Sequence, residues 1–272
     1  MTSSPLRSVR DENDALRLLR AGEFELEGRL LDASNTTLRA FLTLDGVAIR
    51  CVYKPVRGER PLWDFPDGTL ADREVAAYLV SRAVGWDLVP PTVLRDGPLG
   101  PGSCQLWIDE PADAAPLVAF LPATERPAGW HRVAAAHDTA GRSYDLAHAD
   151  DPWLARMAIL DVVINNADRK GGHVLVGEGN RVYGVDHGVC FHVDDKLRTV
   201  LWGWAGHPLP AEGVELLGQL AAAFDGPLGA ELAAHLTRAE VAQLSVRVRR
   251  LLRTGRFPQP RQEGPALPWP PL

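Results

Sequence analysis

Two carboxylates eighteen positions apart are the side chains of this sequence best suited to chemistry. Asp168 follows an apolar segment, and Asp186 ends a short apolar run that leads into Gly188. Phosphoryl transfer needs two such acids, because one orients or deprotonates the attacking hydroxyl and the other holds the metal that bridges the nucleotide phosphates. Either acid alone is typical of a turn. The pair, with apolar segments around it, favours a functional interpretation.

The elements that must position these acids can be predicted from the residues around them. Asp151 as N-cap and Pro152 at the first helical position predict a helix that ends near residue 164. Its apolar residues recur on one helical face, so we expect it to be buried. A polar loop, 165–172, follows the helix. The runs 174–176 and 182–185, separated by a Gly-Glu-Gly-Asn turn, predict a β-hairpin that ends at Asp186.

The first third of the chain has the pattern of an antiparallel meander. Three strands are predicted, at 24–31, 38–44 and 47–53, with Asp45-Gly46 as a hairpin turn and Lys54 at the end of the third strand. Thr69 and Asp72 predict the start of a helix that runs to about residue 84. Further strands are expected at 92–94 and 103–108.

These elements predict an α+β fold with a β-rich N-lobe, a mainly helical C-lobe and a cleft between the lobes. One or two short helices are expected within the Pro/Ala-rich connector, and the tail is predicted to be an extended or disordered strap. The predicted division is an N-terminal extension (1–22), an N-lobe (23–108), a hinge and connector (109–150), a C-lobe (151–253) and a Pro-rich tail (254–272).

Composition narrows the function classes. A formal net charge of −6 argues against nucleic acid as the main partner. No apolar run approaches the roughly 20 residues that span a bilayer, and the N-terminus lacks a secretory signal, so we expect no transmembrane segment and a cytoplasmic location. Cys51, Cys104 and Cys190 have no metal-binding spacing and are expected to be buried hydrophobic residues. The late arginines, 247–256, are typical of a solvated helix face.

The Asp168-Arg169 and Asp186-His187-Gly188 segments resemble the catalytic and metal-binding loops of the phosphatidylinositol 3-/4-kinase-like branch of the protein-kinase-like superfamily. More narrowly, the chain resembles an actinobacterial group of proteins related to those kinases. The resemblance in motif order covers residues 24 to about 250. It implies a bilobal protein-kinase-like fold, ATP with Mg²⁺ or Mn²⁺ as cofactors, and transfer of the γ-phosphate to a hydroxyl of a lipid, protein or small molecule.

The resemblance also implies roles for individual residues. Asp168, followed by Arg169, is implied as the catalytic aspartate and Asp186 as the principal metal ligand. Lys54 would neutralise phosphate charge and Glu74 would be its ion-pair partner. From the residues alone, Lys54 is as readily a solvated strand-end lysine, and Glu74 one of several exposed acids. The implied nucleotide contacts elsewhere are Ser34, Asn35 and Thr36 in a covering loop, and Gln105 and Trp107 in the hinge, 105–109.

His173 departs from the pattern, because the family has a metal-binding Asn five residues after the catalytic Asp. Three interpretations are open: a ligand with altered metal preference, a direct phosphate contact, or loss of the second metal site. A neutral imidazole suits Mn²⁺ or Zn²⁺ better than Mg²⁺. Asn165 and Asn166 are amides that compensate at the metal site or, equally well, cap the preceding helix.

Three functional hypotheses therefore follow from the sequence. The first is an active ATP-dependent kinase. The second is a nucleotide-binding pseudokinase that acts as a regulatory scaffold, favoured by His173 and by the absence of a glycine-rich loop. The third is a metal-dependent hydrolase that uses Asp168, His173 and Asp186. The Trp202-Gly-Trp204 segment is expected to pack against the C-lobe.

Overall fold

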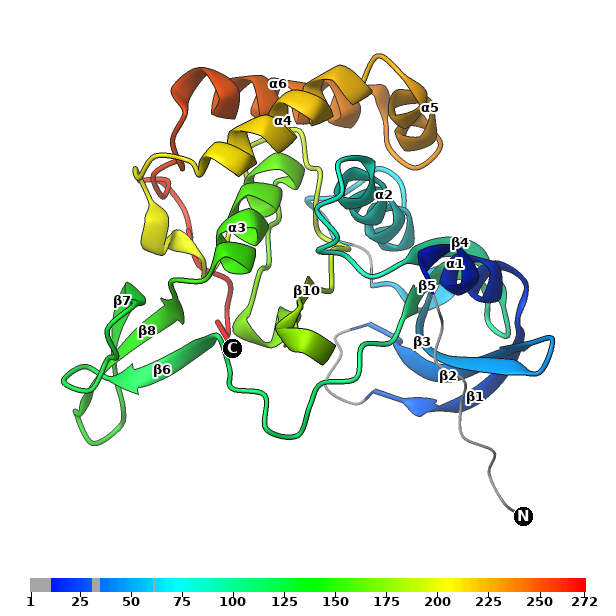
Figure 1. The fold of residues 1–272 in the computed structure, drawn as a ribbon, viewed down its shortest axis with the longest axis horizontal. Coiled ribbons are helices and arrows are strands. Elements are labelled where there is room, and N and C mark those ends of the chain that lie inside the picture. The colour runs from blue at the N-terminus through cyan, green and yellow to red at the C-terminus, as the bar shows by residue number, and fades with distance from the viewer. Residues whose placement is uncertain (1–10, 31–34, 61) are drawn as a thin grey trace.

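The computed structural model describes residues 11–30, 35–60 and 62–272. Its N-terminal part is built on a five-stranded antiparallel sheet with the strand order β1-β2-β3-β5-β4 (Figure 1). The strands are β1 Glu23–Arg29, β2 Leu38–Leu44, β3 Val47–Pro55, β4 Thr92–Gly97 and β5 Gly100–Leu106. The predicted meander is confirmed, and Lys54 lies near the end of its third strand.

Turn chemistry and alternating burial explain why this segment forms a sheet. Asp45 and Gly46 both have positive φ, 52° and 74°, which is the backbone of the two-residue hairpin turns that favour Asp-Gly. Along β3 the side chains of Ile49, Cys51 and Tyr53 point into the core, with half-buried residues between them. This alternation places one face of the sheet against helices.

Two helices pack against the sheet, α1 (Glu12–Ala21) and α2 (Leu70–Ala83). The pattern of residues 10–21 is that of a short amphipathic helix or an N-terminal extension, and the structure has the helix, whose leucines join the core of the N-lobe. As predicted, Thr69 caps α2 by accepting a hydrogen bond from the backbone N–H of Asp72 at 3.0 Å. The helix is buried around most of its circumference, which brings Glu74 into the interior.

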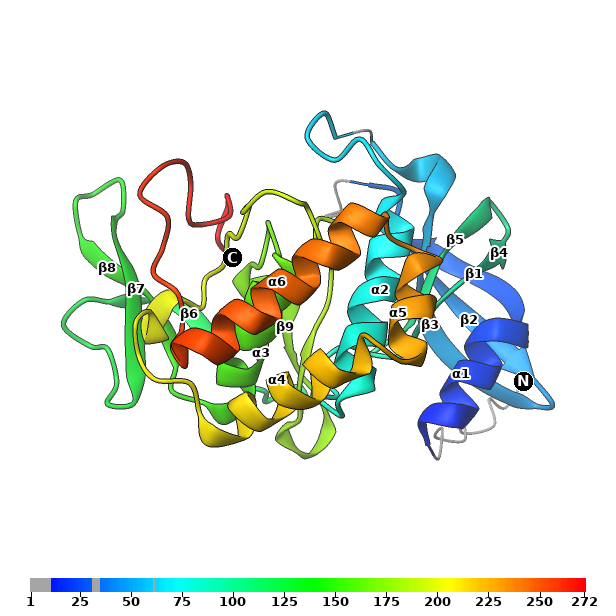
Figure 2. The same cartoon turned by 90° about the horizontal axis from the view of Figure 1, so that it is seen from above.

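The C-terminal part is mainly helical, as predicted. Its helices are α3 Pro152–Ile164, α4 Ala211–Ala223, α5 Pro227–Ala233 and α6 Arg238–Thr254, and the hairpin pairs β9 Val174–Val176 with β10 Val182–Gly184. Short 3₁₀ helices occupy 56–58, 171–173, 178–180 and 202–204. The predicted Asp151 cap of α3 is confirmed, and a Thr237–Glu240 capping box begins α6. Figure 2 shows α4 and α6 lying across α3.

The expectation of short helices within 109–150 is wrong, because this segment forms a three-stranded antiparallel sheet. The strands are β6 Val118–Pro122, β7 Trp130–His137 and β8 Ser143–Ala149, in the order β6-β8-β7. This sheet lies at the opposite end of the molecule from the N-lobe sheet (Figures 1 and 2). Cross-strand pairing overrides the helix propensity of the alanines in β7, and Asp145 of β8 forms ion pairs with Arg126 and Arg132.

The Pro-rich tail is extended and packed on the C-lobe. The backbone carbonyl of Ala266 accepts hydrogen bonds from the Trp202 indole at 2.8 Å and from the backbone N–H of Thr199 at 3.2 Å. The carbonyl of Pro271 accepts from the N–H of Gly171 at 2.8 Å. Of the alternatives, extended strap and disorder, the structure has the strap. The described part of the chain contains no helix with the length and apolar character that crossing a bilayer requires.

A buried ion pair connects α2 of the N-lobe to α6 of the C-lobe. Arg73 Nη1 lies 2.6 Å from Glu240 Oε1, and the two side chains are 3% and 6% exposed. Arg73 also donates to the carbonyls of Cys190 and Asp67. Charges this deeply buried are tolerated only when each has its partner.

We therefore expect Arg73→Ala to lower the free energy of unfolding by about 3–5 kcal/mol, because the Glu240 carboxylate stays buried without its counter-charge. Arg82→Ala is the matched control on the same helix. Arg82 pairs with Glu231 at the surface, and its removal should cost about 1 kcal/mol or less. Urea denaturation of both variants measures the difference, and equal losses would contradict this account.

Candidate functional site

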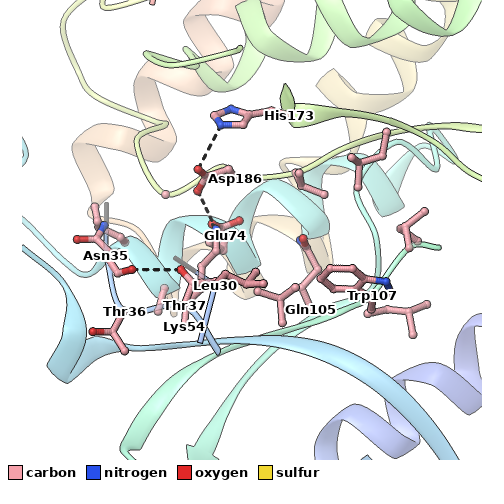
Figure 3. Close-up of a pocket in the computed structure, with 18 of the residues that line it drawn as sticks. Leu30, Asn35, Thr36, Thr37, Lys54, Glu74, Gln105, Trp107, His173 and Asp186 are labelled. Atoms are coloured by element: carbon pink, nitrogen blue, oxygen red, sulfur yellow. Dashed lines mark hydrogen bonds and ion pairs between the residues drawn. The ribbon is translucent and has the colours of Figure 1, made fainter. Parts of the chain in front are cut away.

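A cavity of about 450 Å³ lies between the N-lobe sheet, α2 and the β9–β10 hairpin (Figure 3). Its two ends differ in polarity. Apolar side chains form part of the lining: Leu30, Val52, Leu106, Ile108 and Leu175. Lys54, Glu74, His173 and Asp186 lie together at one end, the polar end, and Gln105 and Trp107 lie toward the other (Figure 3). A cavity with this mixture of apolar and polar side chains is typical of a small-molecule site.

Lys54 is held between two carboxylates at the polar end of the cavity. Its ammonium lies 2.7 Å from Asp186 Oδ1 and also forms an ion pair with Glu74. The two carboxylates raise the pKa of Lys54 against the lowering effect of burial. The strand-end lysine is therefore not a solvated one, and Glu74, which is 2% exposed, is not a surface acid.

Asp186 is placed by an unusual backbone conformation. Its φ is +61°, in the left-handed region that non-glycine residues rarely adopt and that Asp tolerates better than most. The next N–H, of His187, donates to Glu74 Oε2 at 3.0 Å. A Cβ on Gly188 would lie 3.2 Å from the Leu70 Cβ, so the turn passes close to α2. The Asp186 side chain is 51% exposed and faces the cavity.

His173 and Asp186 face each other across the polar end (Figure 3). Their closest atoms, Nε2 and Oδ2, are 3.4 Å apart. Burial lowers the pKa of His173 to about 4, against the opposing effect of the Asp186 carboxylate. The imidazole is therefore neutral at pH 7, which is the form that binds a metal. The nearby Lys54 ammonium lowers the pKa of Asp186, so its carboxylate is ionised.

Asp168 lies beside the cavity but is not among the described residues that line it. Its carboxylate is 3.3 Å from the Lys170 ammonium, and its own N–H donates to Asn166 Oδ1 at 2.9 Å. Burial raises the pKa of Asp168, and the Asp186 carboxylate raises it further, whereas Lys170 and Arg198 lower it. The two acids therefore lie close enough for their charges to interact.

Arg169 is fully buried, so its guanidinium does not reach the cavity. It pairs with Asp161 of α3, which is also fully buried, at 3.0 Å. The same guanidinium donates to the carbonyls of His173 at 3.2 Å and Val185 at 3.0 Å. It also contacts His187 Nε2 at 2.7 Å. The arrangement gives Arg169 a positioning contact to both loops.

The two asparagines have structural partners. Asn165 caps α3 with a left-handed backbone, φ 54°, and its side-chain amide donates to the carbonyls of His192 and Asp194. Asn166 donates to Asp161 Oδ1 at 3.0 Å. Both are at most 1% exposed. Of the alternatives for these amides, the structure therefore favours the structural one.

The remaining predicted nucleotide contacts differ in their placement. Asn35, Gln105 and Trp107 line the cavity. Gln105 is fixed by a hydrogen bond from its amide to Thr92 Oγ1 at 2.8 Å, and the Trp107 indole donates to Asp109 at 3.0 Å. Ser34 lies outside the described residues.

Asp186 and His173 could together hold a divalent cation. Asp186 Oδ2 and His173 Nε2 present one oxygen and one nitrogen to the same space. The described residues contain no group of three or more His, Cys, Asp and Glu side chains that could hold a metal alone. Magnesium is commonly held by one or two carboxylates with phosphates and water completing its shell, which this pair allows. Within the described part of the chain, Asp168, His173 and Asp186 do not form such a group.

Sequence reasoning missed three residues of the site. Asp161 sits within an apolar helix pattern, and an acid at a buried helical position is the signal that could have identified it. Lys170, two positions after Asp168, pairs with that acid. Glu59 accepts hydrogen bonds from the N–H groups of Leu70 and Ala71 at the start of α2, for which the sequence offers no signal.

The fold is a two-lobed α+β architecture with a cavity between the lobes. The chain belongs to the same family as protein Rv2133c of Mycobacterium tuberculosis (strain ATCC 25618 / H37Rv). The two are 49% identical over 271 residues, and the match covers 97% of this chain and 96% of that protein. No protein-family model matches the chain.

More distant similarities were also found. Phosphatidylinositol 4-kinase gamma 4 of Oryza sativa subsp. japonica is 27% identical over 205 residues, which is 68% of this chain and 31% of the rice protein. Among solved structures, the Golgi casein kinase has a TM-score of 0.48 at 14% identity, covering 89% of this chain and 74% of its own. The Helicobacter pylori proinflammatory kinase CtkA has a TM-score of 0.48 at 9% identity, covering 88% and 95%.

The lowered pKa of His173 predicts a stability that depends on pH. Between pH 6.5 and about 4 the imidazole is protonated in the unfolded chain and neutral in the folded one, so stability is full above this window and is lost as the pH falls through it. When the pH is lowered from 6.5 to 5, we expect His173→Asn to lose about 2 kcal/mol less of its free energy of unfolding than the parent loses.

Denaturant unfolding at the two pH values measures this loss for parent and variant. His137→Asn, at an exposed position, is the control and should lose as much stability as the parent. Asp168, whose pKa is raised by burial, changes stability in the opposite direction, but it is common to all three proteins and cancels in the comparison. If the parent and His173→Asn lose the same stability between the two pH values, the lowered pKa of His173 is contradicted.

Proposed function

We propose that the chain is an ATP-dependent phosphotransferase that moves the γ-phosphate to a hydroxyl of a lipid, protein or small molecule. The observation that carries the proposal is Lys54, whose ammonium is held by Glu74 and Asp186 at the polar end of the cavity. Phosphoryl transfer relies on positioning and on charge neutralisation more than on covalent chemistry. A fixed ammonium beside an ionised carboxylate supplies both.

The cavity suits a nucleotide in size and polarity. Its volume of about 450 Å³ lies within the usual range of small-molecule sites, roughly 300–1,000 Å³. The base would lie between Leu30 and Val52 on one side and Leu175 on the other, near Gln105 and Trp107. The phosphates would then lie beside Lys54, with Asn35 near the covering loop.

The polar end has the groups that a metal–nucleotide complex needs. Asp186 and His173 would hold Mg²⁺ or Mn²⁺, which when bound supplies neutralisation of charge on the phosphates. The nitrogen of His173 favours Mn²⁺ relative to an all-oxygen site. Ionised Asp186 and neutral His173 are both in the protonation state that metal binding requires.

Asp168 would accept the hydrogen bond of the acceptor hydroxyl, and Lys170 would keep its carboxylate oriented. Burial raises the pKa of Asp168, which makes it a better proton acceptor than an exposed aspartate. Arg169, held by Asp161, would act as a positioning residue through the carbonyls of His173 and Val185 rather than by contact with substrate. Assignment to the phosphatidylinositol 3-/4-kinase-like branch is part of this proposal, supported by the partial match to the rice kinase.

Asp186→Asn should lower metal-dependent ATP turnover by at least about a hundredfold, because the amide removes the negative charge that faces the metal. Asn is the substitution of choice since it tolerates the positive φ at this position. Turnover is followed as phosphate or ADP released with Mg²⁺ and with Mn²⁺ in the presence of candidate hydroxyl acceptors.

Asp194→Asn is the matched control, an exposed carboxylate a few residues further along the same segment. It should retain the activity of the parent. Turnover in Asp186→Asn that equals the parent would overturn the proposed catalytic role.

A second candidate is a nucleotide-binding pseudokinase that serves as a regulatory scaffold. Two observations favour it. His173 stands where the resembling kinases have a metal-binding Asn, and Asp168 is paired with Lys170 rather than lining the cavity among the described residues. In this function the nucleotide would stabilise the interlobe arrangement without being cleaved.

Thermal unfolding with ATP separates the two candidates. Both predict that ATP raises the unfolding temperature, and the active kinase predicts a larger rise with Mn²⁺ together with turnover on some acceptor. Lys54→Met should reduce the ATP-induced rise relative to the parent. A rise that needs no metal, with no turnover on any acceptor tried, would favour the scaffold, and no rise at all would exclude both.

A further inference from the structure

A second cavity, of about 690 Å³, lies on the C-lobe. It shares no described lining residue with the cavity that contains Lys54 and Asp186, called the interlobe cavity below. One wall is the C-terminal half of α6, from Gln243 to Thr254. Another is formed by α3 near Val162 and by the segment 193–206, and the Pro-rich tail, 256–261, closes the cavity. The tail is therefore a wall of this cavity as well as a strap.

Four arginines line this second cavity, against the single carboxylate of Asp195. Arg247 and Arg250 come from α6, and Arg256 and Arg261 from the tail. Within the described part of the chain, none of the four forms an ion pair with a carboxylate. Unbalanced positive charge in a concave site attracts anions.

Backbone carbonyls hold three of these guanidiniums in place. Arg247 donates to the carbonyls of Val163 at 2.8 Å and His192 at 3.2 Å. Arg256 donates to Gly206 at 2.7 Å and Arg261 to Asp195 at 2.5 Å. Neutral carbonyls orient the groups without cancelling their charge, so the cavity keeps its positive character.

Arg247 is the group with most to gain from a ligand. Its Nη2 is buried and has no hydrogen-bond partner among the described residues. Burial lowers the pKa of Arg247 to about 10, which reflects a desolvated charge. A buried donor left without a partner is costly, and an anion that accepts from it removes that cost.

Apolar residues form part of the remaining lining. Trp202 and Pro258 are half-buried there and Val193 and Val246 are exposed, whereas Leu197, Leu251 and Phe257 are almost fully buried beneath them. Inorganic phosphate alone would leave this part of the cavity without contact. The combination of oriented arginines with an apolar lining selects a ligand that has an anionic head and a short apolar body.

We propose that the C-lobe cavity is a binding site for a phosphate-bearing amphiphile, with the phosphate at Arg247 and Arg250 and the apolar body against the accessible apolar side chains of the lining, among them Trp202 and Val246. Charge-assisted hydrogen bonds to the two arginines fix the head group. The site is independent of the interlobe cavity, so the proposal stands whether or not the chain transfers phosphate.

Octyl phosphate, below its micelle concentration, is the probe, and titration calorimetry on the full chain measures its affinity. Inorganic phosphate tests the head alone and 1-octanol the body alone, and both should bind at least about tenfold more weakly. Arg250→Gln, at an exposed position, and Arg247→Gln should each weaken octyl phosphate by about tenfold or more. Arg249→Gln, on the same helix outside the cavity lining, should bind as the parent does.

Titration in the presence of saturating ATP tests where the probe binds, and the affinity should be unchanged. The proposal is overturned if the parent binds no octyl phosphate, if ATP displaces it, or if the Arg250→Gln and Arg247→Gln variants both retain the parent's affinity. Inorganic phosphate or octanol binding as tightly as octyl phosphate would also overturn it.

Discussion

The ion pair of Asp161 with Arg169 is the interaction on which the geometry of the site depends. Both side chains are fully buried, and the Asp161 carboxylate also accepts hydrogen bonds from Asn166 and Thr199. Arg169 carries the constraint outward to the carbonyls of His173 and Val185. A charge pair in the interior is stable only with near-complete hydrogen bonding, since removal of one partner leaves an uncompensated charge. The loop after α3 and the turn at Asp186 are thereby fixed relative to one another.

A second set of contacts extends this constraint across the two lobes. Glu74 belongs to α2 of the N-lobe, yet it accepts the N–H of His187 from the C-lobe and pairs with Lys54 from β3. Asp186 completes the set through Lys54, with a left-handed backbone that the surrounding hydrogen bonds must support. A displacement of α2 would therefore disturb Lys54 and Asp186 together. The geometry of the polar end of the cavity thus depends on the relative position of the two lobes.

Turns and helix caps could be predicted from short stretches of sequence. The features that were missed depend on contacts between residues far apart in the chain. The Asp45-Gly46 hairpin and the helix caps at Thr69, Asp151 and Thr237 depend on neighbours in sequence, so they could be read directly. The sheet within 109–150 depends on pairing between strands and on the buried Asp145, which no short window contains. In the site, the sequence singled out both Lys54 and Arg169. It could not show that Lys54 lines the cavity while Arg169 is buried away from it, because burial depends on the tertiary structure.

Net charge proved a poor guide to the chemistry of the interior surfaces. The chain carries a formal charge of −6, yet the interlobe and C-lobe cavities each present cationic side chains. In the interlobe cavity, Lys54 is balanced by Glu74 and Asp186, so an anionic ligand there is expected to bring its own cation. In the C-lobe cavity the guanidiniums are oriented by neutral carbonyls, so the charge remains to be neutralised by the ligand itself. The two cavities thus differ in what their cations are paired with, carboxylates in one and neutral carbonyls in the other.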